Sequence, residues 1–166
     1  MSKIKYDGYE LEYFDSAYNF RNYQLSLIKK YLNGNLAEVG PGKGEFFNYY
    51  KRYLKAINLI EPDKNLFNLL KKKHNKKNVK ITNKTINNVK DKFESIIYFD
   101  VLEHIENDLK EVQNAKKRLK NNGILIFSVP AFQIFYNEFD KSVGHFKRYN
   151  KKDFKKLSIK KNLKIE

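Results

Sequence analysis

The sequence predicts an α/β fold in which a mostly parallel sheet is covered by helices on both faces. Two observations support this prediction. Short apolar runs alternate along the chain with longer amphipathic segments, which is the order of strands and crossover helices in such a fold. The chain has 166 residues, 41% of them hydrophobic, which is enough for one domain with a buried core. We therefore treat residues 1–166 as a single domain.

Strands are predicted where apolar residues run together between turn residues. They are Leu36–Val39, Ala56–Ile60, Val79–Thr82, Ser95–Phe99 and Gly123–Val129. Each run is short and almost continuously apolar, as expected for strands that are buried on both faces.

Helices are predicted between these strands. They are Glu45–Tyr53, Lys64–Lys73 and Asp108–Leu119, preceded by an N-terminal helical segment, residues 1–32, whose helix runs roughly over Ser16–Leu32. In the helix at Asp108–Leu119, Leu109, Val112 and Ala115 share one face, and lysines occupy the other.

The end of the chain predicts a helix at Lys151–Ser158 and a sixth strand at Leu163–Glu166. Because the sequence stops there, we expect the C-terminal strands of the sheet to be missing and its last strand to be an exposed hydrophobic edge. Such an edge can pair with a second copy, so a homo-oligomer is one expectation.

Composition excludes several kinds of chemistry. The chain has no cysteine, which excludes disulfides, thiolate nucleophiles and cysteine-ligated metals. No apolar run approaches the roughly 20 residues of a membrane-spanning helix, and the start is too polar for a secretory signal, so we expect a cytoplasmic protein. The net charge of +15 comes mostly from lysine. Since arginine, the usual phosphate and guanine reader, is scarce, we favour a solvated basic surface over a nucleic-acid partner.

The segment Leu36–Phe46 carries a strand through three alternate glycines into a helix. Gly40, Gly42 and Gly44 permit a sharp turn and a close approach of a ligand to free amides at the helix start. The spacing is not that of a dinucleotide fingerprint, because Glu45 stands where the third glycine belongs. It is not a P-loop either, because no Gly-Lys-Ser/Thr follows.

Two acidic residues end the first two strands. Glu38 would repel a pyrophosphate but suits a ligand with an ammonium group. Glu61 follows the second strand at a position where an acid can accept both hydroxyls of a ribose. The predicted ligand is therefore part amino acid and part nucleoside. The alternative is that both acids cap neighbouring helix starts and the glycines only form a tight turn.

Four motifs follow one another along the chain. They are Glu38–Gly44 (EVGPGKG), Ile60–Asp63 (IEPD), Tyr98–Ile105 (YFDVLEHI) and Leu119–Leu125 (LKNNGIL). In this order they resemble class I S-adenosylmethionine-dependent methyltransferases. The resemblance implies a Rossmann-like sheet of order 3-2-1-4-5-7-6, with S-adenosyl-L-methionine as cofactor and S-adenosyl-L-homocysteine as product.

The resemblance also implies residue roles. The glycines would cradle the methionine part, Glu61 would hold the ribose, residues 82–86 would border the adenine, and Asp100 would face the cofactor beside the acceptor. The expected cofactor-binding residues are Glu38, Gly40, Pro41, Gly42, Gly44, Glu61, Pro62, Thr85, Ile86, Asp100 and Val101.

The acceptor side is predicted in the segment Val129–Tyr149, which looks like the P-A…D…GH-x-R-Y stretch of small-molecule and glycan-pathway methyltransferases. His145 could be the general base for a hydroxyl acceptor, and Asp100 is a second catalytic candidate. The alternative is that Asp140 pairs with Arg148 and His145 only caps a loop.

Asp100, Glu103 and His104 stand at i, i+3 and i+4, on one side of a helical turn. A similar set binds a divalent ion in ubiquinone-pathway O-methyltransferases. Because many members of the larger family carry Leu-Glu-His without a metal, we expect no metal here and keep this set as the alternative.

These observations favour methyl transfer, by in-line displacement, to an oxygen or nitrogen of a small-molecule or sugar-linked acceptor. Two alternatives stay open. One is an RNA methyltransferase, favoured by the charge but by no RNA-binding motif. The other is a non-catalytic remnant that binds the cofactor without turnover.

Overall fold

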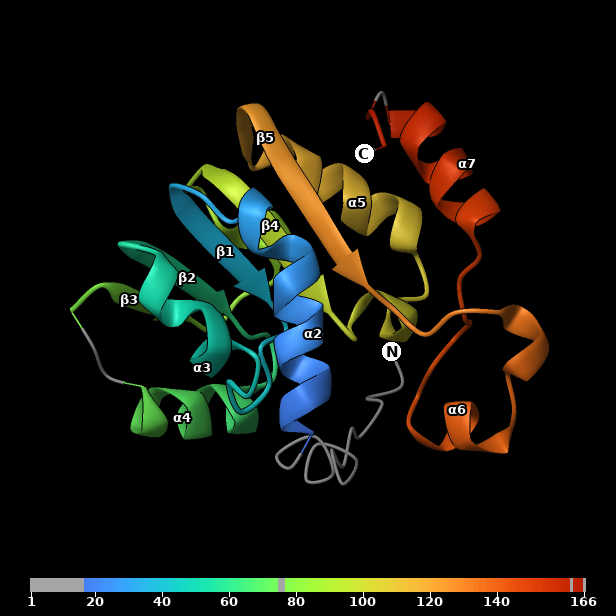
Figure 1. Cartoon of the computed structure of the whole chain (residues 1–166), viewed down its shortest axis with the longest axis horizontal. Helices are drawn as coiled ribbons and strands as arrows, with labels where there is room; N and C mark the ends of the chain where they lie inside the picture. Colours follow the sequence, from blue (N-terminus) through green and yellow to red (C-terminus); the bar gives the residue numbers. More distant parts are fainter. Residues whose placement is uncertain (1–16, 75–76, 162, 166) are drawn as a thin grey trace.

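The computed structural model describes residues 17–74, 77–161 and 163–165. Within them a five-stranded parallel sheet has the order β3-β2-β1-β4-β5 (Figure 1). The strands are β1 (Asn35–Val39), β2 (Ala56–Ile60), β3 (Val79–Thr82), β4 (Phe93–Phe99) and β5 (Leu119–Ser128). The predicted α/β fold with a parallel sheet is confirmed.

The helices lie on both faces of this sheet (Figure 1). They are α2 (Tyr18–Ile28), α3 (Phe47–Tyr50), α4 (Lys64–Lys73), α5 (Asp108–Lys117), α6 (Glu138–Ser142) and α7 (Lys151–Lys161). Short 3-10 helices lie at Lys29–Tyr31, Lys51–Tyr53, Ile86–Asn88, Leu102–His104 and Gln133–Phe135. Among the described helices, none is both long and apolar enough to cross a membrane.

Each face of the sheet has its own apolar core, because successive side chains of a strand point to opposite faces. Leu36 of β1 packs with α2, α3 and α4 on one face, whereas its neighbour Ala37 packs toward α5 on the other. A third cluster joins α5 to α7 through Val112 and Leu157. The central strands are thus covered on both faces, which explains the continuous apolar runs that predicted them.

The carboxyl ends of the strands meet at one edge of the sheet. The backbone pairing continues one residue beyond β1, β2 and β4: the N–H of Gly40 donates to Ile60, that of Glu61 to Thr82, and that of Asp100 to Ser128, at 2.9, 3.0 and 2.9 Å. Three of the predicted site residues therefore begin loops at the same edge. In parallel α/β sheets this is the edge where ligands bind.

The predicted sixth strand is wrong for the described residues, whereas the helix predicted before it is present as α7. Residues 163–165 form no strand, and Glu166 lies outside the described residues. α7 continues to Lys161, and the N–H of Leu163 then donates to the carbonyl of Ser158 at 2.9 Å. Leu163 also packs against the α5–α7 cluster. The chain folds back on the end of its own helix instead of extending along the sheet.

Several predicted bounds also differ from the structure. β1 and β4 begin one and two residues earlier than predicted, β5 replaces the strand predicted at Gly123–Val129, and the helix predicted at Glu45–Tyr53 is α3 followed by a 3-10 helix. The helix α5 ends at Lys117 because β5 already begins at Leu119. The pairing of β5 with β4 jumps from Leu119 to Ile124, so the intervening residues form a bulge in which Asn122 has a φ of 59°. At the N-terminus, α2 begins at Tyr18, and Ser16 lies outside the described residues.

Asp63 caps the start of α4, since its Oδ1 accepts the backbone N–H of Asn65 and Leu66 at 2.8 and 2.9 Å. We expect Asp63→Ala to lower the free energy of unfolding by about 1 kcal/mol. Asp63→Ser keeps an oxygen acceptor and should stay close to the native stability. Urea unfolding followed by circular dichroism measures both variants. An alanine variant as stable as the native chain would contradict the capping role.

Candidate functional site

The turn after β1 needs glycine at two positions, because the backbone is left-handed there and because a side chain would clash with neighbouring residues. Gly40 and Gly44 have φ values of 67° and 82°, in the left-handed region that favours glycine. A Cβ at Gly40 would lie 2.8 Å from Cγ2 of Val101, and one at Gly44 would lie 2.8 Å from Nε2 of His74. The N–H of Gly44 closes the turn on the carbonyl of Pro41 at 2.8 Å. The turn is therefore packed closely against α4 and the loop after β4.

Glu61 joins this turn to the end of β2. Its Oε2 accepts the N–H of Gly42 at 3.0 Å, and its Oε1 accepts the N–H of Asp63 at 2.9 Å. Asn83 supports the same segment, because its Nδ2 donates to the carbonyls of Glu61 and Pro62, both at 2.9 Å. Burial raises the pKa of Glu61 to about 7, although the two backbone N–H groups act to lower it.

The carboxylate of Glu61 is suited to a ribose. Each of its oxygens has one backbone N–H donor here and keeps a second lone pair. Two neighbouring hydroxyls could therefore each donate to one oxygen without displacing the turn. The alternative that Glu38 and Glu61 cap helix starts is wrong here: Asp63 is the N-cap of α4, α3 has no side-chain cap, and Glu61 accepts the N–H groups of Gly42 and Asp63.

Glu38 lies beneath the turn and is 2% exposed. Its Oε2 accepts the hydroxyl of Tyr50 at 2.5 Å. Burial raises the pKa of Glu38 to about 7, against the lowering effect of the Tyr50 hydrogen bond. Glu38 thus holds α3 against β1, a pairing that the sequence analysis did not identify.

Asp100 ends β4 with a φ of 54° and is paired with the first helix. Nη1 of Arg21 lies 3.2 Å from Oδ2 of Asp100 and 2.8 Å from Oε1 of Gln24. Burial raises the pKa of Asp100, whereas Arg21 acts to lower it. Sequence analysis missed Arg21. Two features could have indicated Arg21: arginine is rare in this lysine-rich chain, and Arg21 stands one helical turn before Leu25, which is buried.

The residues expected near the adenine start the 3-10 helix after β3. Thr85 is exposed, whereas Ile86 is fully buried in the second core. The side chain of Thr85 is therefore accessible to a ligand, and the side chain of Ile86 belongs to the core.

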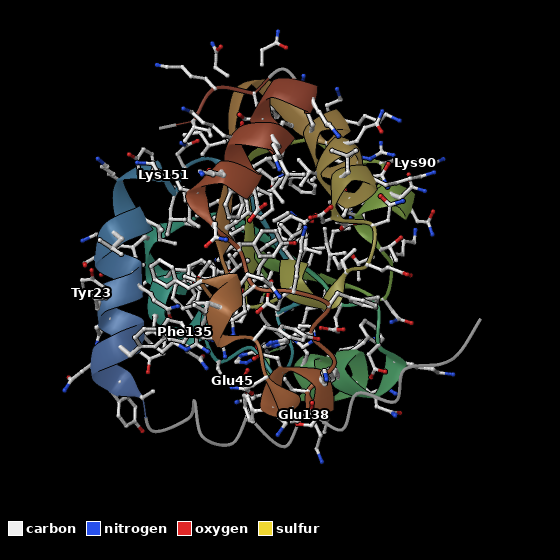
Figure 2. The ribbon with its side chains drawn as sticks, turned by 90° about the vertical axis from the view of Figure 1, so that its right-hand side faces the viewer. Tyr23, Glu45, Lys90, Phe135, Glu138 and Lys151 are labelled. Carbon is white, nitrogen blue, oxygen red and sulfur yellow. The ribbon has the colours of Figure 1, made fainter. Side chains whose placement is uncertain are left out.

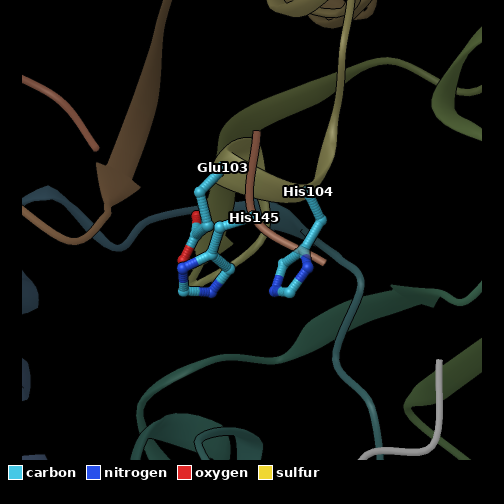
Figure 3. Close-up of side chains that lie close together, drawn as sticks. All are labelled: Glu103, His104 and His145. Atoms are coloured by element: carbon cyan, nitrogen blue, oxygen red, sulfur yellow. The ribbon is translucent and has the colours of Figure 1, made fainter. Parts of the chain in front are cut away.

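Glu103, His104 and His145 come together from the loops after β4 and α6 (Figure 3). One potential ligand atom of each lies within 4.8 Å of the others. The two imidazole rings meet edge to face, with centroids 4.6 Å apart. The N–H of Phe146 donates to the carbonyl of Glu103 at 2.8 Å, which fixes one loop on the other. The predicted set of Asp100, Glu103 and His104 is thus not the one that the structure groups.

Asp140 orients His145. Its Oδ1 lies 2.8 Å from Nδ1 of His145, and Nε of Arg148 donates to both carboxylate oxygens at 2.8 and 3.0 Å. Burial acts to raise the pKa of Asp140, but hydrogen bonds from Arg148, His145 and the N–H of Asn137 lower it to about 2. Since an ionised carboxylate only accepts, Nδ1 of His145 donates this hydrogen bond, and in the neutral ring Nε2 is then the nitrogen with a lone pair.

Glu103 is fully buried, and neither of its carboxyl oxygens has a hydrogen-bond partner among the described residues. Burial, together with the nearby charges of Asp100 and Asp140, raises its pKa to about 8, although its own backbone N–H acts to lower it. A buried carboxyl group without donors is costly for folding. Its environment therefore favours a cation or a proton at this position.

The segment between β5 and α7 exposes several large apolar side chains (Figure 2, where Phe135 is labelled). They are Phe132, Ile134, Phe135 and Phe139. Tyr136 ties the segment to the cluster, since its hydroxyl donates to the carbonyl of His145 at 2.7 Å. The segment that carries these exposed apolar side chains is thus joined to the loop of His145.

Two hollows lie elsewhere. One of about 610 Å³ opens at the amino ends of β1, β2 and β3, among Lys55, Lys77 and Lys80. Another of about 350 Å³ runs beside β5, among Leu27, Phe127 and Phe154. Neither includes the glycine turn. We place the candidate site at the carboxyl edge, because its polar groups converge there and ligands of parallel α/β sheets bind at that edge.

A sequence model of the family described as "Methyltransferase domain" matches residues 12–165. No curated protein matches the sequence significantly. Solved structures share the fold. A proposed methyltransferase of Bacillus halodurans C-125 is 19% identical, with a TM-score of 0.72 over 85% of this chain and 68% of that one.

Two further solved structures share the fold. The YcgJ protein of Bacillus subtilis is 16% identical, with a TM-score of 0.72 over 84% of this chain and 68% of that one. CalS10, an amino pentose methyltransferase of Micromonospora echinaspora solved with S-adenosylmethionine, is 14% identical, with a TM-score of 0.60 over 76% of this chain and 58% of that one. At these identities the likeness establishes the fold.

The raised pKa of Glu38 makes stability depend on pH. The folded chain holds this proton more tightly than the unfolded chain, whose ordinary value is 4.5, so stability falls as pH rises from 4.5 through 7. We expect Glu38→Gln to remove this part of the dependence, which amounts to about 3 kcal/mol. Urea unfolding of both proteins between about pH 4 and pH 8 measures the difference. Parallel stability curves would contradict the assignment.

Proposed function

We propose that this chain, which belongs to the methyltransferase-domain family, transfers a methyl group to an oxygen or nitrogen of a small-molecule or sugar-linked acceptor. Its cofactor is S-adenosyl-L-methionine, and its product is S-adenosyl-L-homocysteine. The observation that carries the proposal is the hydrogen bond between Gly42 and Glu61, which brings the glycine turn and a ribose-type acid to one edge of the sheet.

The residues of this edge divide the cofactor between them in the proposal. Gly40, Gly42 and Gly44 give the methionine part a backbone surface without side chains. Glu61 accepts the ribose hydroxyls through the lone pairs that the turn leaves available. Glu38, buried under the turn, supplies negative potential toward the ammonium group and holds α3 in place. Thr85 borders the adenine.

The bound cofactor supplies a methyl group on a sulfonium sulfur, which leaves as a neutral thioether when the acceptor attacks from the opposite side. The chain has to hold the acceptor in line and remove its proton. Nε2 of His145 takes this proton in the proposal, because Asp140 fixes the proton on Nδ1 and stabilises the imidazolium that forms. Asp100, held by Arg21, shapes the wall between cofactor and acceptor.

A small apolar or sugar-linked acceptor suits this edge better than a nucleic acid. The segment 132–139 exposes several aromatic side chains, and the hydroxyl of its Tyr136 donates to the carbonyl of His145. CalS10, which has a similar fold, acts on an amino pentose. The positive charge is spread over lysines, and Lys141 and Lys147 beside the cluster are paired with Glu138 and Asp108.

Loss of the ribose acid should weaken cofactor binding. We expect Glu61→Ala to lower the affinity for S-adenosylhomocysteine by about 1–3 kcal/mol, because the ribose hydroxyls and the Gly42 N–H lose their acceptor. Isothermal titration calorimetry measures it. The exposed Glu106→Ala is the matched control, and a thermal melt checks that Glu61→Ala is folded. Unchanged affinity of a folded Glu61→Ala would refute the ribose assignment.

His145 is expected to act on the acceptor and not on the cofactor. His145→Ala should slow methyl transfer by about 10²–10⁴-fold, the usual contribution of a general base, while the affinity for S-adenosylhomocysteine stays close to native. A release assay for S-adenosylhomocysteine with a panel of hydroxyl and amine acceptors, run beside calorimetry, separates the two effects. Equal turnover of the variant would remove His145 from the mechanism.

A further inference from the structure

We propose that Glu103, His104 and His145 form a binding site for one divalent transition-metal ion on the acceptor side of the sheet edge. The site itself stands on the geometry of these three residues. Its use in catalysis rests on the proposed methyl transfer. The sequence pattern alone pointed to another set, in which Asp100 took the place of His145 (Figure 3).

The donor set indicates the class of metal. Two imidazoles and one carboxylate are the ligands of open, three-ligand zinc sites, which keep a fourth position for water or substrate. Nitrogen donors favour zinc and its neighbours in the first transition row, whereas magnesium and calcium prefer oxygen ligands throughout. The site should therefore select Zn²⁺ or Co²⁺ over Mg²⁺.

The surroundings of His145 match those of a metal-binding imidazole. Such histidines usually donate their second N–H to a carboxylate, which fixes the tautomer and the ring orientation. Nδ1 of His145 lies 2.8 Å from Asp140, and Asp140 is itself held by Arg148 and by the N–H of Asn137. Nε2 is thereby left as the ligand nitrogen. The Asp140–Arg148 pair of the structural alternative is present as well, and Asp140 also belongs to the capping box of α6.

Glu103 supplies a second, independent observation. It is completely buried, and both of its carboxyl oxygens lack a hydrogen-bond partner among the described residues. Its carboxyl group points toward the ring of His145 (Figure 3). A cation at this position would compensate the buried charge, which no protein donor does here.

The distances are compatible with small side-chain movements. Three ligand atoms arranged tetrahedrally at about 2.1 Å from one ion lie about 3.4 Å from each other. The potential ligand atoms here lie within 4.8 Å of one another, so rotations of the three side chains would close the remaining gap. The loops need not move, since the N–H of Phe146 already joins them through the carbonyl of Glu103.

The metal would change how the acceptor is activated. An acceptor hydroxyl at the fourth position would lose its proton to solvent because the cation lowers its pKa, and its oxygen would then attack the methyl carbon as the carbon–sulfur bond breaks. With the ion bound, Nε2 of His145 would hold the metal and could not be the base, a role it would keep only in the metal-free chain. The cation would then supply the activation of the acceptor.

The direct test titrates Co²⁺ into the metal-stripped full chain and follows its visible ligand-field absorption. We expect one ion per chain, displaced by equimolar Zn²⁺ but not by excess Mg²⁺. Glu103→Gln and His145→Gln should each weaken Co²⁺ binding at least 10-fold, as should Asp140→Asn, which acts through His145. Glu106→Gln, an exposed acid three residues from Glu103, is the matched control and should bind as the native chain does.

Each outcome decides the proposal. No absorption change in the native chain, or equal binding by all variants, overturns the site. The native titration decides even if a variant misfolds, which thermal melts would reveal. Co²⁺ binding without methyl transfer to any acceptor would support the site and count against the proposed function. Methyl transfer that is unaffected by a chelator, with no Co²⁺ bound, would overturn the metal site and leave the proposed function standing.

Discussion

The hydrogen bond from the Gly42 N–H to Glu61 is the contact on which the candidate site depends. It connects two loops that follow adjacent parallel strands, at the level where Val39 pairs with Ile60. The turn packs against its neighbours only because Gly40 and Gly44 carry no side chains, since a Cβ at Gly40 would collide with Val101 and one at Gly44 with α4 and His74. The strand pairing, the glycine turn and the buried Glu61 therefore together fix how the loops after β1 and β2 lie against each other. These two loops form the proposed ligand surface.

The same edge concentrates acids that folding alone would not favour. Glu38, Glu61, Asp100 and Glu103 are each largely buried or enclosed by the loops, and burial raises the pKa of all four. Three of them have a polar partner: Glu38 a tyrosine hydroxyl, Glu61 two backbone N–H groups, and Asp100 an arginine. The carboxyl oxygens of Glu103 have no hydrogen-bond partner among the described residues. Clusters of perturbed acids of this kind are more typical of functional sites than of structural cores.

Sequence reasoning succeeded where the determining interactions are local. The bounds of β2 and β3 were predicted residue for residue. β2 lies inside the parallel sheet and is a nearly continuous apolar run, whereas β3 lies at the edge and alternates apolar residues with Lys80 and Thr82. Long-range pairs were not predictable in this way: Arg21 and Asp100 stand 79 residues apart, and only the fold brings them together. The strand predicted at the end of the chain was wrong for a related reason. Leu163 has the apolar pattern of a strand, but its packing against α7 decides its conformation.

The central claim is that the turn after β1 and the acid after β2 form one binding surface for the cofactor. A crystal structure of the chain with S-adenosylhomocysteine tests it most directly. The account predicts the amino acid part along residues 40–44 and both ribose hydroxyls within hydrogen-bond distance of Glu61. Density for the nucleoside in the hollow beside β5, or at the amino ends of the strands, would contradict the account.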